Sequence, residues 1–133
     1  MAYTYSFEKL DVWKASRQLV VWIYKITSAF PGEEKFGLVS QMRRAAISVV
    51  SNLAEGSARK SPKDQAHFYQ IAYSSLIELL NQLILSNDLH FLSDEFLNEG
   101  RNKIERITSG VGALRNAQVS KLKINPKQST LNQ

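Results

Sequence analysis

Apolar residues recur at intervals of three and four along most of this 133-residue chain, and strict alternation of apolar and polar residues nowhere lasts beyond a few positions. The pattern is typical of amphipathic helices. Turn residues interrupt it at three places, which predicts helices at about residues 11–30, 36–60, 62–89 and 94–118. Because short turns make neighbouring helices antiparallel, we expect an all-α, up-and-down four-helix bundle.

The predicted helix starts carry recognisable capping residues. Asp11 is a candidate N-cap for the first helix. Ser61 followed by Pro62 is the clearest start in the chain, because serine caps well and proline suits the first helical position. Ser93 is the corresponding candidate for the fourth helix.

The predicted helix ends are less sharply defined. Pro31 disfavours helical backbone in the residue before it, so the first helix should stop at Phe30. The second helix should end at Gly56, a natural left-handed cap, or one turn later near Lys60. The fourth should end near Gln118, so that residues 1–118 form a single domain and residues 119–133 a flexible basic tail.

The fourth predicted helix carries three glycines, Gly100, Gly110 and Gly112. Each costs about 1 kcal/mol of helix stability relative to alanine. We therefore expect this helix to depend on tertiary contacts or on close approach of its backbone to another helix.

One stripe of the second helix is polar beside an apolar one. It contains Gln41, Ser48, Asn52 and Glu55, and the third helix offers Glu78 and neighbouring polar residues. Burying an unpaired carboxylate costs several kcal/mol, so Glu55 should face solvent or pair with a nearby cation. The stripe could be hydrated, shared between the two helices, or placed between subunits, where polar contacts set register.

Seventeen basic and twelve acidic residues give the chain a formal net charge of +5. The first basic cluster consists of Arg43, Arg44, Arg59, Lys60 and Lys63. In the second, residues 101–127, seven basic residues accompany a single acidic one. Such clusters attract phosphate backbones, although a solvated surface gives the same pattern.

Little in the sequence suggests an enzyme. The two histidines, His67 and His90, lie on different segments without metal-ligand spacing, and the chain has no cysteine. Glu55 and Glu78 could meet in space but lack the Glu-x-x-His motifs of di-iron bundles. No glycine-rich loop has phosphate-binding spacing. We expect no catalytic residues, no metal and no cofactor.

Other features bear on location and on partners. The first thirteen residues lack the features of a secretory signal, and the longest apolar run, residues 19–24, is too short to cross a membrane. Together with the absence of cysteine, this favours a cytoplasmic protein without a membrane partner. If the second helix ends at Gly56, residues 56–61 form a longer connection than the turn of a helix-turn-helix motif. If it ends near Lys60, the turn is short enough, but the next helix has few polar residues at its start for reading DNA. Tyr3, Tyr5, Tyr69 and Tyr73 could stack on bases, although aromatic residues at helical spacing usually belong to a core or an interface.

Three stretches together resemble a known family. They are "FEKLDVWKAS" (7–16), "FPGEEKFGLVSQMRRAAISVVSNLAEGSARKS" (30–61) and "FYQIAYSSLIELLNQL" (68–83). Their order is similar to that in the four-helix bundle family encoded by intervening sequences of bacterial large-subunit (23S) rRNA genes. The resemblance covers about residues 7–118 and includes the Ser-x-x-Glu of the third helix, Ser75 and Glu78.

This resemblance implies a ring-like homopentamer, similar in fold to the accessory protein of diversity-generating retroelements. That relative uses a basic surface to engage nucleic acid and a reverse transcriptase. We therefore expect a non-enzymatic, oligomeric adaptor that binds RNA or DNA electrostatically, with a protein partner as a further possibility. The alternative is a self-assembling structural module without a nucleic-acid partner.

Overall fold

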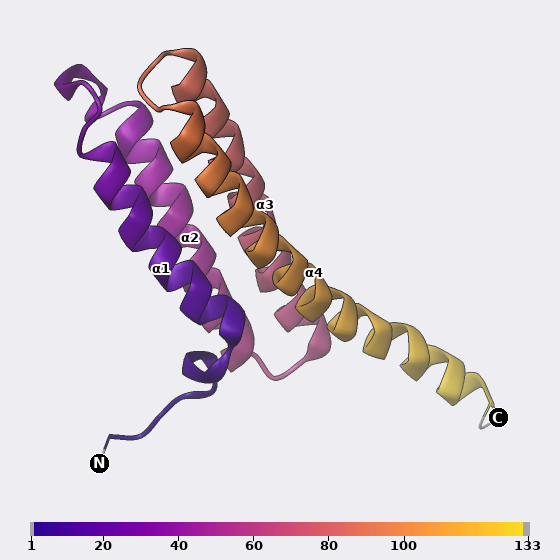
Figure 1. The fold of residues 1–133 in the computed structure, drawn as a ribbon. Coiled ribbons are helices and arrows are strands. Elements are labelled where there is room, and N and C mark those ends of the chain that lie inside the picture. Colours follow the sequence, from indigo (N-terminus) through magenta and orange to yellow (C-terminus); the bar gives the residue numbers. More distant parts are fainter. Residues whose placement is uncertain (1, 132–133) are drawn as a thin grey trace.

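The computed structural model describes the backbone of residues 2–131 and the side chains of residues 2–123. Over this range the chain forms four α-helices and two short 3-10 helices, and no strand. The elements are η1 (Ser6–Lys9), α1 (Asp11–Thr27), η2 (Gly32–Glu34), α2 (Leu38–Ala58), α3 (Pro62–Asp88) and α4 (Asp94–Leu131). Consecutive helices run in opposite directions (Figure 1). The prediction of an all-α four-helix bundle is confirmed.

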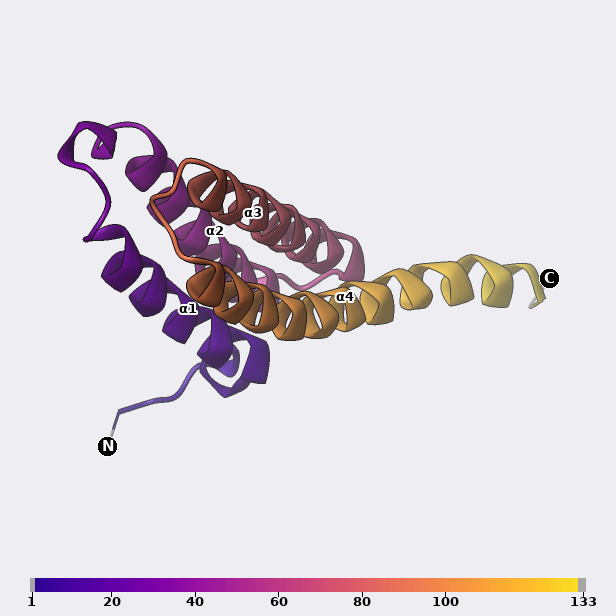
Figure 2. The same ribbon diagram turned by 45° about the horizontal axis from the view of Figure 1, so that its top comes forward.

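The helices enclose one hydrophobic core, to which all four contribute. The contacts between α2 and α3 and between α3 and α4 are the most extensive, whereas α1 packs mainly on α2. The large side chains that are almost fully buried include Leu19, Ile23, Met42, Leu53, Leu76, Leu79, Leu83, Ile104 and Ile107. Figure 2 shows α4 passing beside the other helices and then extending beyond them. None of the helices within residues 2–131 is long and apolar enough to cross a membrane.

The start of α3 has the predicted cap. The side chain of Ser61 accepts a hydrogen bond of 3.1 Å from the Asp64 backbone N–H, and Pro62 takes the first helical position. The prediction for α1 was wrong by one residue: Leu10 is the N-cap, and Asp11 is the first helical residue. There its charge still interacts favourably with the positive end of the helix dipole.

Helix α1 ends at Thr27, one turn before the predicted end at Phe30. Two hydroxyl groups account for the difference. Thr27 Oγ1 donates to the carbonyl of Ile23 at 2.6 Å, and Ser28 Oγ donates to the carbonyl of Tyr24 at 2.7 Å. The backbone then tightens into i to i+3 turns through Phe30, so the helix closes before Pro31 is reached.

One of the two predicted ends of α2 was a left-handed cap at Gly56, and this alternative was wrong. The helix passes through it to Ala58, and no glycine among the described residues has a positive φ. Instead, the position is sterically closed, because a Cβ on Gly56 would lie 2.7 Å from Cε1 of Tyr69. Glycine is needed here for the close approach of α2 and α3.

Two of the three glycines in α4 also mark close approaches. A Cβ at Gly100 would lie 2.9 Å from both Leu83 Cδ1 and Trp22 Cη2, and one at Gly110 would clash with Val12. A Cβ at Gly112 would make only an ordinary contact with Tyr73 at 3.9 Å. Gly100 and Gly110 therefore let α4 come close to α1, as the sequence led us to expect.

The predicted end of α4 near Gln118 was wrong, because the helix continues to Leu131. No glycine follows Gly112 in the sequence, and half-buried Leu114, Gln118 and Leu122 continue the seam of the helix. Most of residues 119–133, which were expected to form a flexible basic tail, therefore lie in α4. Residues 132 and 133 fall outside the described range, and the flexibility of the segment stays a prediction.

Candidate nucleic-acid interface

The basic side chains are concentrated at the end of the bundle where α2 joins α3. We call the set formed by residues 2–17, 55–67 and 113–123 the α2–α3 end. These segments lie in the lower part of Figure 1, where the C-terminal part of α4 extends away from the other helices. They carry nine basic and four acidic residues. The basic ones are Lys9, Lys14, Arg17, Arg59, Lys60, Lys63, Arg115, Lys121 and Lys123.

The opposite end of the bundle is electrically balanced. Its segments, residues 25–44 and 88–103, carry six basic and six acidic residues. The excess of five positive charges at the α2–α3 end thus equals the formal net charge of +5 of the whole chain. A patch of one sign raises the local concentration of an oppositely charged ligand.

Three members of the first predicted cluster lie at this end. Lys60 and Lys63 are exposed, in the α2–α3 connection and in the first turn of α3. Arg59 lies with its guanidinium carbon 4.6 Å from the centre of the Phe68 ring. Its Nη2 also forms an ion pair of 3.2 Å with Glu55 Oε2. About half of the Arg59 side chain, 47%, is nevertheless exposed.

The other two members, Arg43 and Arg44, lie far from these three. Arg44 lies in α2 and precedes Arg59, the residue that follows this helix, by fifteen residues, which corresponds to about 22 Å along the axis. Arg43 turns toward α1, where its Nε donates a 3.0 Å hydrogen bond to Thr27 Oγ1 and its guanidinium covers the Tyr24 ring. The five residues therefore do not form one patch.

Part of the predicted polar stripe lies between α2 and α3. Ser48 Oγ and Ser75 Oγ are 2.8 Å apart, and Asn52 Nδ2 donates to the carbonyl of Ser48 at 2.8 Å and to its Oγ at 3.0 Å. All three side chains are half-buried. They form a small hydrogen-bonded network that links the two helices within one chain.

The remaining members of the stripe are on the surface. Gln41, Glu55 and Glu78 are exposed. Glu55 pairs with Arg59, one helical turn further on, and Glu78 accepts a 3.3 Å hydrogen bond from Gln82 Nε2. Neither carboxylate is buried, and Glu55 both faces solvent and pairs with a nearby cation, which were the two expectations from the sequence.

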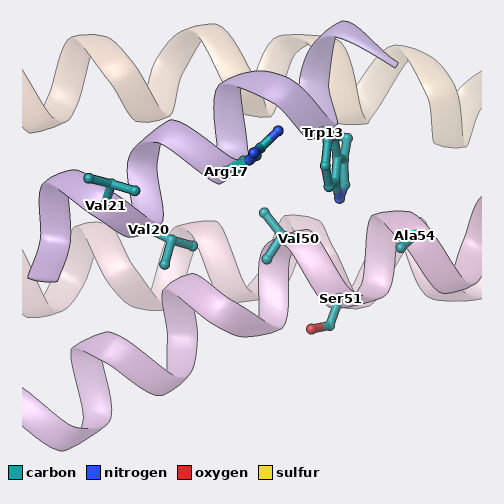
Figure 3. A pocket seen from close by; sticks show the side chains of 7 residues that line it. All are labelled: Trp13, Arg17, Val20, Val21, Val50, Ser51 and Ala54. Carbon is teal, nitrogen blue, oxygen red and sulfur yellow. The ribbon is translucent and has the colours of Figure 1, made fainter. Parts of the chain in front are cut away.

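An apolar groove runs between α1 and α2. It has a volume of about 360 Å³ and is lined by Trp13, Arg17, Val20, Val21, Val50, Ser51 and Ala54. Figure 3 shows Val20 and Val50 facing each other across it, with Trp13 at one end. Val21 on its rim is 67% exposed. An apolar surface of this kind favours contact with another protein surface.

The titratable side chains of the described residues are mostly on the surface. They contain no group of three or more His, Cys, Asp or Glu residues that could hold a metal ion. His67 packs edge-on against Phe68, and His90 has a φ of 65° in the turn before α4; both are exposed. Burial raises the pKa of the Tyr69 hydroxyl above its ordinary value of 10.0.

Several residues at the α2–α3 end were not singled out from the sequence. Arg115 was counted only as part of a long basic segment, yet its guanidinium lies 5.2 Å from the centre of the Tyr73 ring and donates to Gln70 Oε1. Lys9, Lys14 and Arg17 were not considered at all. Antiparallel pairing of helices brings these separate segments together, and a helix-by-helix count of charges along the predicted bundle could have found them.

Comparisons with known proteins agree with the fold. A crystal structure of a protein with unknown function from the S23 ribosomal protein family of Bacteroides thetaiotaomicron VPI-5482 superposes with a TM-score of 0.73 at 21% sequence identity. The match covers 79% of this chain and 95% of that one. No curated protein matches. The profile of the family described as 23S rRNA-intervening sequence protein matches residues 8–113, and the chain belongs to this family.

Proposed function

We propose that this protein is a non-enzymatic adaptor that binds a cytoplasmic RNA or DNA through the positively charged α2–α3 end of its bundle. The observation that carries the proposal is the distribution of charge. One end of the bundle has nine basic and four acidic residues, and the other end has six of each. Contacts of this kind engage the phosphate backbone and tolerate many sequences.

The basic side chains of the α2–α3 end differ in how firmly they are held in place. Arg59 and Arg115 rest on aromatic rings and have hydrogen-bonding partners. Lys60 and Lys63 are exposed, and a flexible ammonium group can follow a phosphate as the backbone passes. Together they provide fixed and adaptable positive charges at one end of the bundle.

The proposal includes self-association. The apolar groove between α1 and α2 is open, and Val21 on its rim is 67% exposed. A second copy of the chain is the occupant we propose, and the resemblance noted in the sequence implies five copies in a ring. A ring would repeat the α2–α3 end in each subunit, so that one nucleic acid could contact several patches and bind more tightly than to one.

The test is a binding assay with labelled RNA and duplex DNA at low salt, with the mass of the assembly measured in the same buffer. The double variant Lys60→Gln, Lys63→Gln should bind both nucleic acids more weakly than the parent. The matched control is Lys35→Gln, Arg44→Gln, which removes two exposed charges from the balanced end and should leave the affinity within about twofold. Equal losses for the two variants would contradict the proposed location.

The second candidate function is a structural module that assembles with itself and binds no nucleic acid. The apolar groove is the observation that favours it, because self-association needs no cationic surface. An intact oligomer that binds neither RNA nor DNA at low salt would support this alternative and overturn the adaptor proposal.

A further inference from the structure

A hollow at the α2–α3 end has a lining that the charge argument does not use. It lies between the N-terminal segment and the last two turns of α2, and Tyr3, Tyr5, Glu55, Ala58 and Arg59 are among the residues that line it. Its volume is about 550 Å³, within the range of pockets that hold small organic ligands. It therefore combines exposed aromatic rings with an arginine at the positive end of the molecule.

A chain of ring contacts holds the N-terminal segment at this place. Tyr5 stacks at 6.4 Å on Phe7, and Phe7 packs edge-on against Trp13 at 4.9 Å, which ties the segment to α1. The Tyr5 backbone N–H also donates a 2.8 Å hydrogen bond to Glu8 Oε2. The position of the two tyrosines is thus set by the first turns of the chain.

The rings of Tyr3 and Tyr5 nevertheless remain open to a ligand. Tyr3 is 76% exposed and Tyr5 is 61% exposed, and their centres are 4.8 Å apart at an interplanar angle of 81°. At these exposures much of each side chain is accessible to a ligand. An exposed, positioned aromatic face is what a planar heterocycle needs for stacking, and every nucleobase has such a face.

Arg59 supplies a second type of contact beside these rings. Phe68 and Glu55 hold its guanidinium in place, and a guanidinium carries five N–H donors. The ion pair with Glu55 engages Nη2. Other donors can reach a phosphate oxygen, and charge-assisted contacts from arginine to phosphate are among the strong hydrogen bonds. Glu55 opposes an anion, but its charge is balanced by Arg59 itself.

We propose that this hollow binds an unpaired nucleobase of single-stranded RNA or DNA, stacked on Tyr3 or Tyr5, with Arg59 contacting the adjoining phosphate. This inference rests on the proposed function and deepens it, because it specifies the form of nucleic acid. In a duplex the base faces are covered by their neighbours, and exposing one costs a few kcal/mol of unstacking. The tyrosine rings should therefore discriminate in favour of single strands, whereas the lysines should not.

The test compares three labelled probes of the same sequence, each about twelve nucleotides or base pairs long. They are single-stranded RNA, single-stranded DNA and blunt duplex DNA. We expect Tyr3→Ala, Tyr5→Ala to weaken single-strand binding by about 5- to 150-fold, the range for one stacked base, and duplex binding by less than about twofold. The variant Tyr3→Phe, Tyr5→Phe keeps the rings and should bind like the parent. Lys60→Gln should weaken the binding of all three probes.

The outcomes separate this inference from the proposed function. If the parent binds the probes but the alanine variant loses nothing, or loses single strands and duplex alike, the base site is wrong and the electrostatic proposal stands. If the parent binds none of the probes at low salt, both are overturned. The variants Lys60→Gln and Tyr3→Phe, Tyr5→Phe keep the ring contacts of the N-terminal segment, so both should melt at the temperature of the parent.

Discussion

Arginine side chains of this protein lie repeatedly over aromatic rings. Arg43 covers Tyr24 at 4.3 Å, Arg59 covers Phe68 at 4.6 Å and Arg115 covers Tyr73 at 5.2 Å. Each contact contributes about 0.5–1 kcal/mol at an exposed site. It also reduces the number of rotamers available to the side chain, so less entropy remains to be lost when the guanidinium binds a ligand.

The first prediction concerns the close contact at Gly56. We expect Gly56→Ala to lower the free energy of unfolding by about 1–3 kcal/mol, because its Cβ would press on the ring of Tyr69 in the contact between α2 and α3. Gly112→Ala is the matched control, since its Cβ has room and should raise helix stability by about 0.5–1 kcal/mol. Urea unfolding of both variants measures the difference. A neutral Gly56→Ala would contradict the packing described.

The second prediction separates the two parts of the polar stripe. Asn52→Ala should cost about 0.5–1.5 kcal/mol of unfolding free energy, because it removes two hydrogen bonds in a half-buried network. Glu55→Ala removes only an exposed ion pair and should cost less than about 0.5 kcal/mol. The comparison uses urea unfolding at the same pH. A larger loss for Glu55→Ala than for Asn52→Ala would argue that Glu55 is buried in an assembly.

At the scale of the helix, starts were easier to predict than ends. Ser61, Pro62 and Ser93 are local signals, and the structure places their caps where the sequence did, with Ser93 Oγ accepting from the Phe96 N–H at 3.1 Å. The end of α1 depended on which carbonyl a hydroxyl would reach, and the role of Gly56 depended on a tyrosine in another helix. The contact of Gly56 with Tyr69 lies between two helices and is not visible when one helix is read alone.

The third prediction tests the cap of α3. Ser61→Ala should lower the unfolding free energy by about 0.5–2 kcal/mol, because the Asp64 N–H loses its partner. Ser51 is exposed within α2, so Ser51→Ala serves as a control and should be neutral or slightly stabilising. Thermal unfolding of both variants is the measurement. Equal melting temperatures for the two variants would show that the cap contributes nothing.

The candidate interface could be predicted from the sequence only where its residues are close together along the chain. The sequence identified Arg59, Lys60 and Lys63 because they are close together in one basic stretch. It grouped Arg43 and Arg44 with them, although about 22 Å of helix separates the two sets. It could not foresee that Arg43 would turn toward Thr27, since that choice is made by the packing of α1 against α2.

At the scale of the whole molecule, two surfaces account for the two proposed properties. The α2–α3 end carries the excess positive charge, and the groove between α1 and α2 offers an apolar contact. Val20 and Val50, which face each other in the groove, lie further along α1 and α2 from that end than Arg17 and Arg59 do. Trp13 and Arg17 of the α2–α3 end line the groove themselves, whereas Lys60 and Lys63 do not. Self-association through the groove would therefore leave these two lysines accessible.

The fourth prediction tests the groove. Val21→Asp should lower the mass of the assembly in light scattering, because it places a charge on an exposed apolar rim. The fold should be unaffected, since the side chain is 67% exposed in one chain. Ile77→Asp is the control: Ile77 is 47% exposed on α3, and we expect the mass to stay unchanged. Dissociation by Ile77→Asp alone would place the interface elsewhere.

The most direct test of the central claim is the salt dependence of nucleic-acid affinity. The logarithm of the binding constant of a duplex falls with the logarithm of salt concentration with a slope of about −0.9 for each phosphate neutralised. We predict that Lys60→Gln, Lys63→Gln makes this slope shallower by up to about two, whereas Lys35→Gln, Arg44→Gln leaves it unchanged. A slope near zero for the parent, or an equal change in both variants, would contradict the claim that the α2–α3 end is the binding surface.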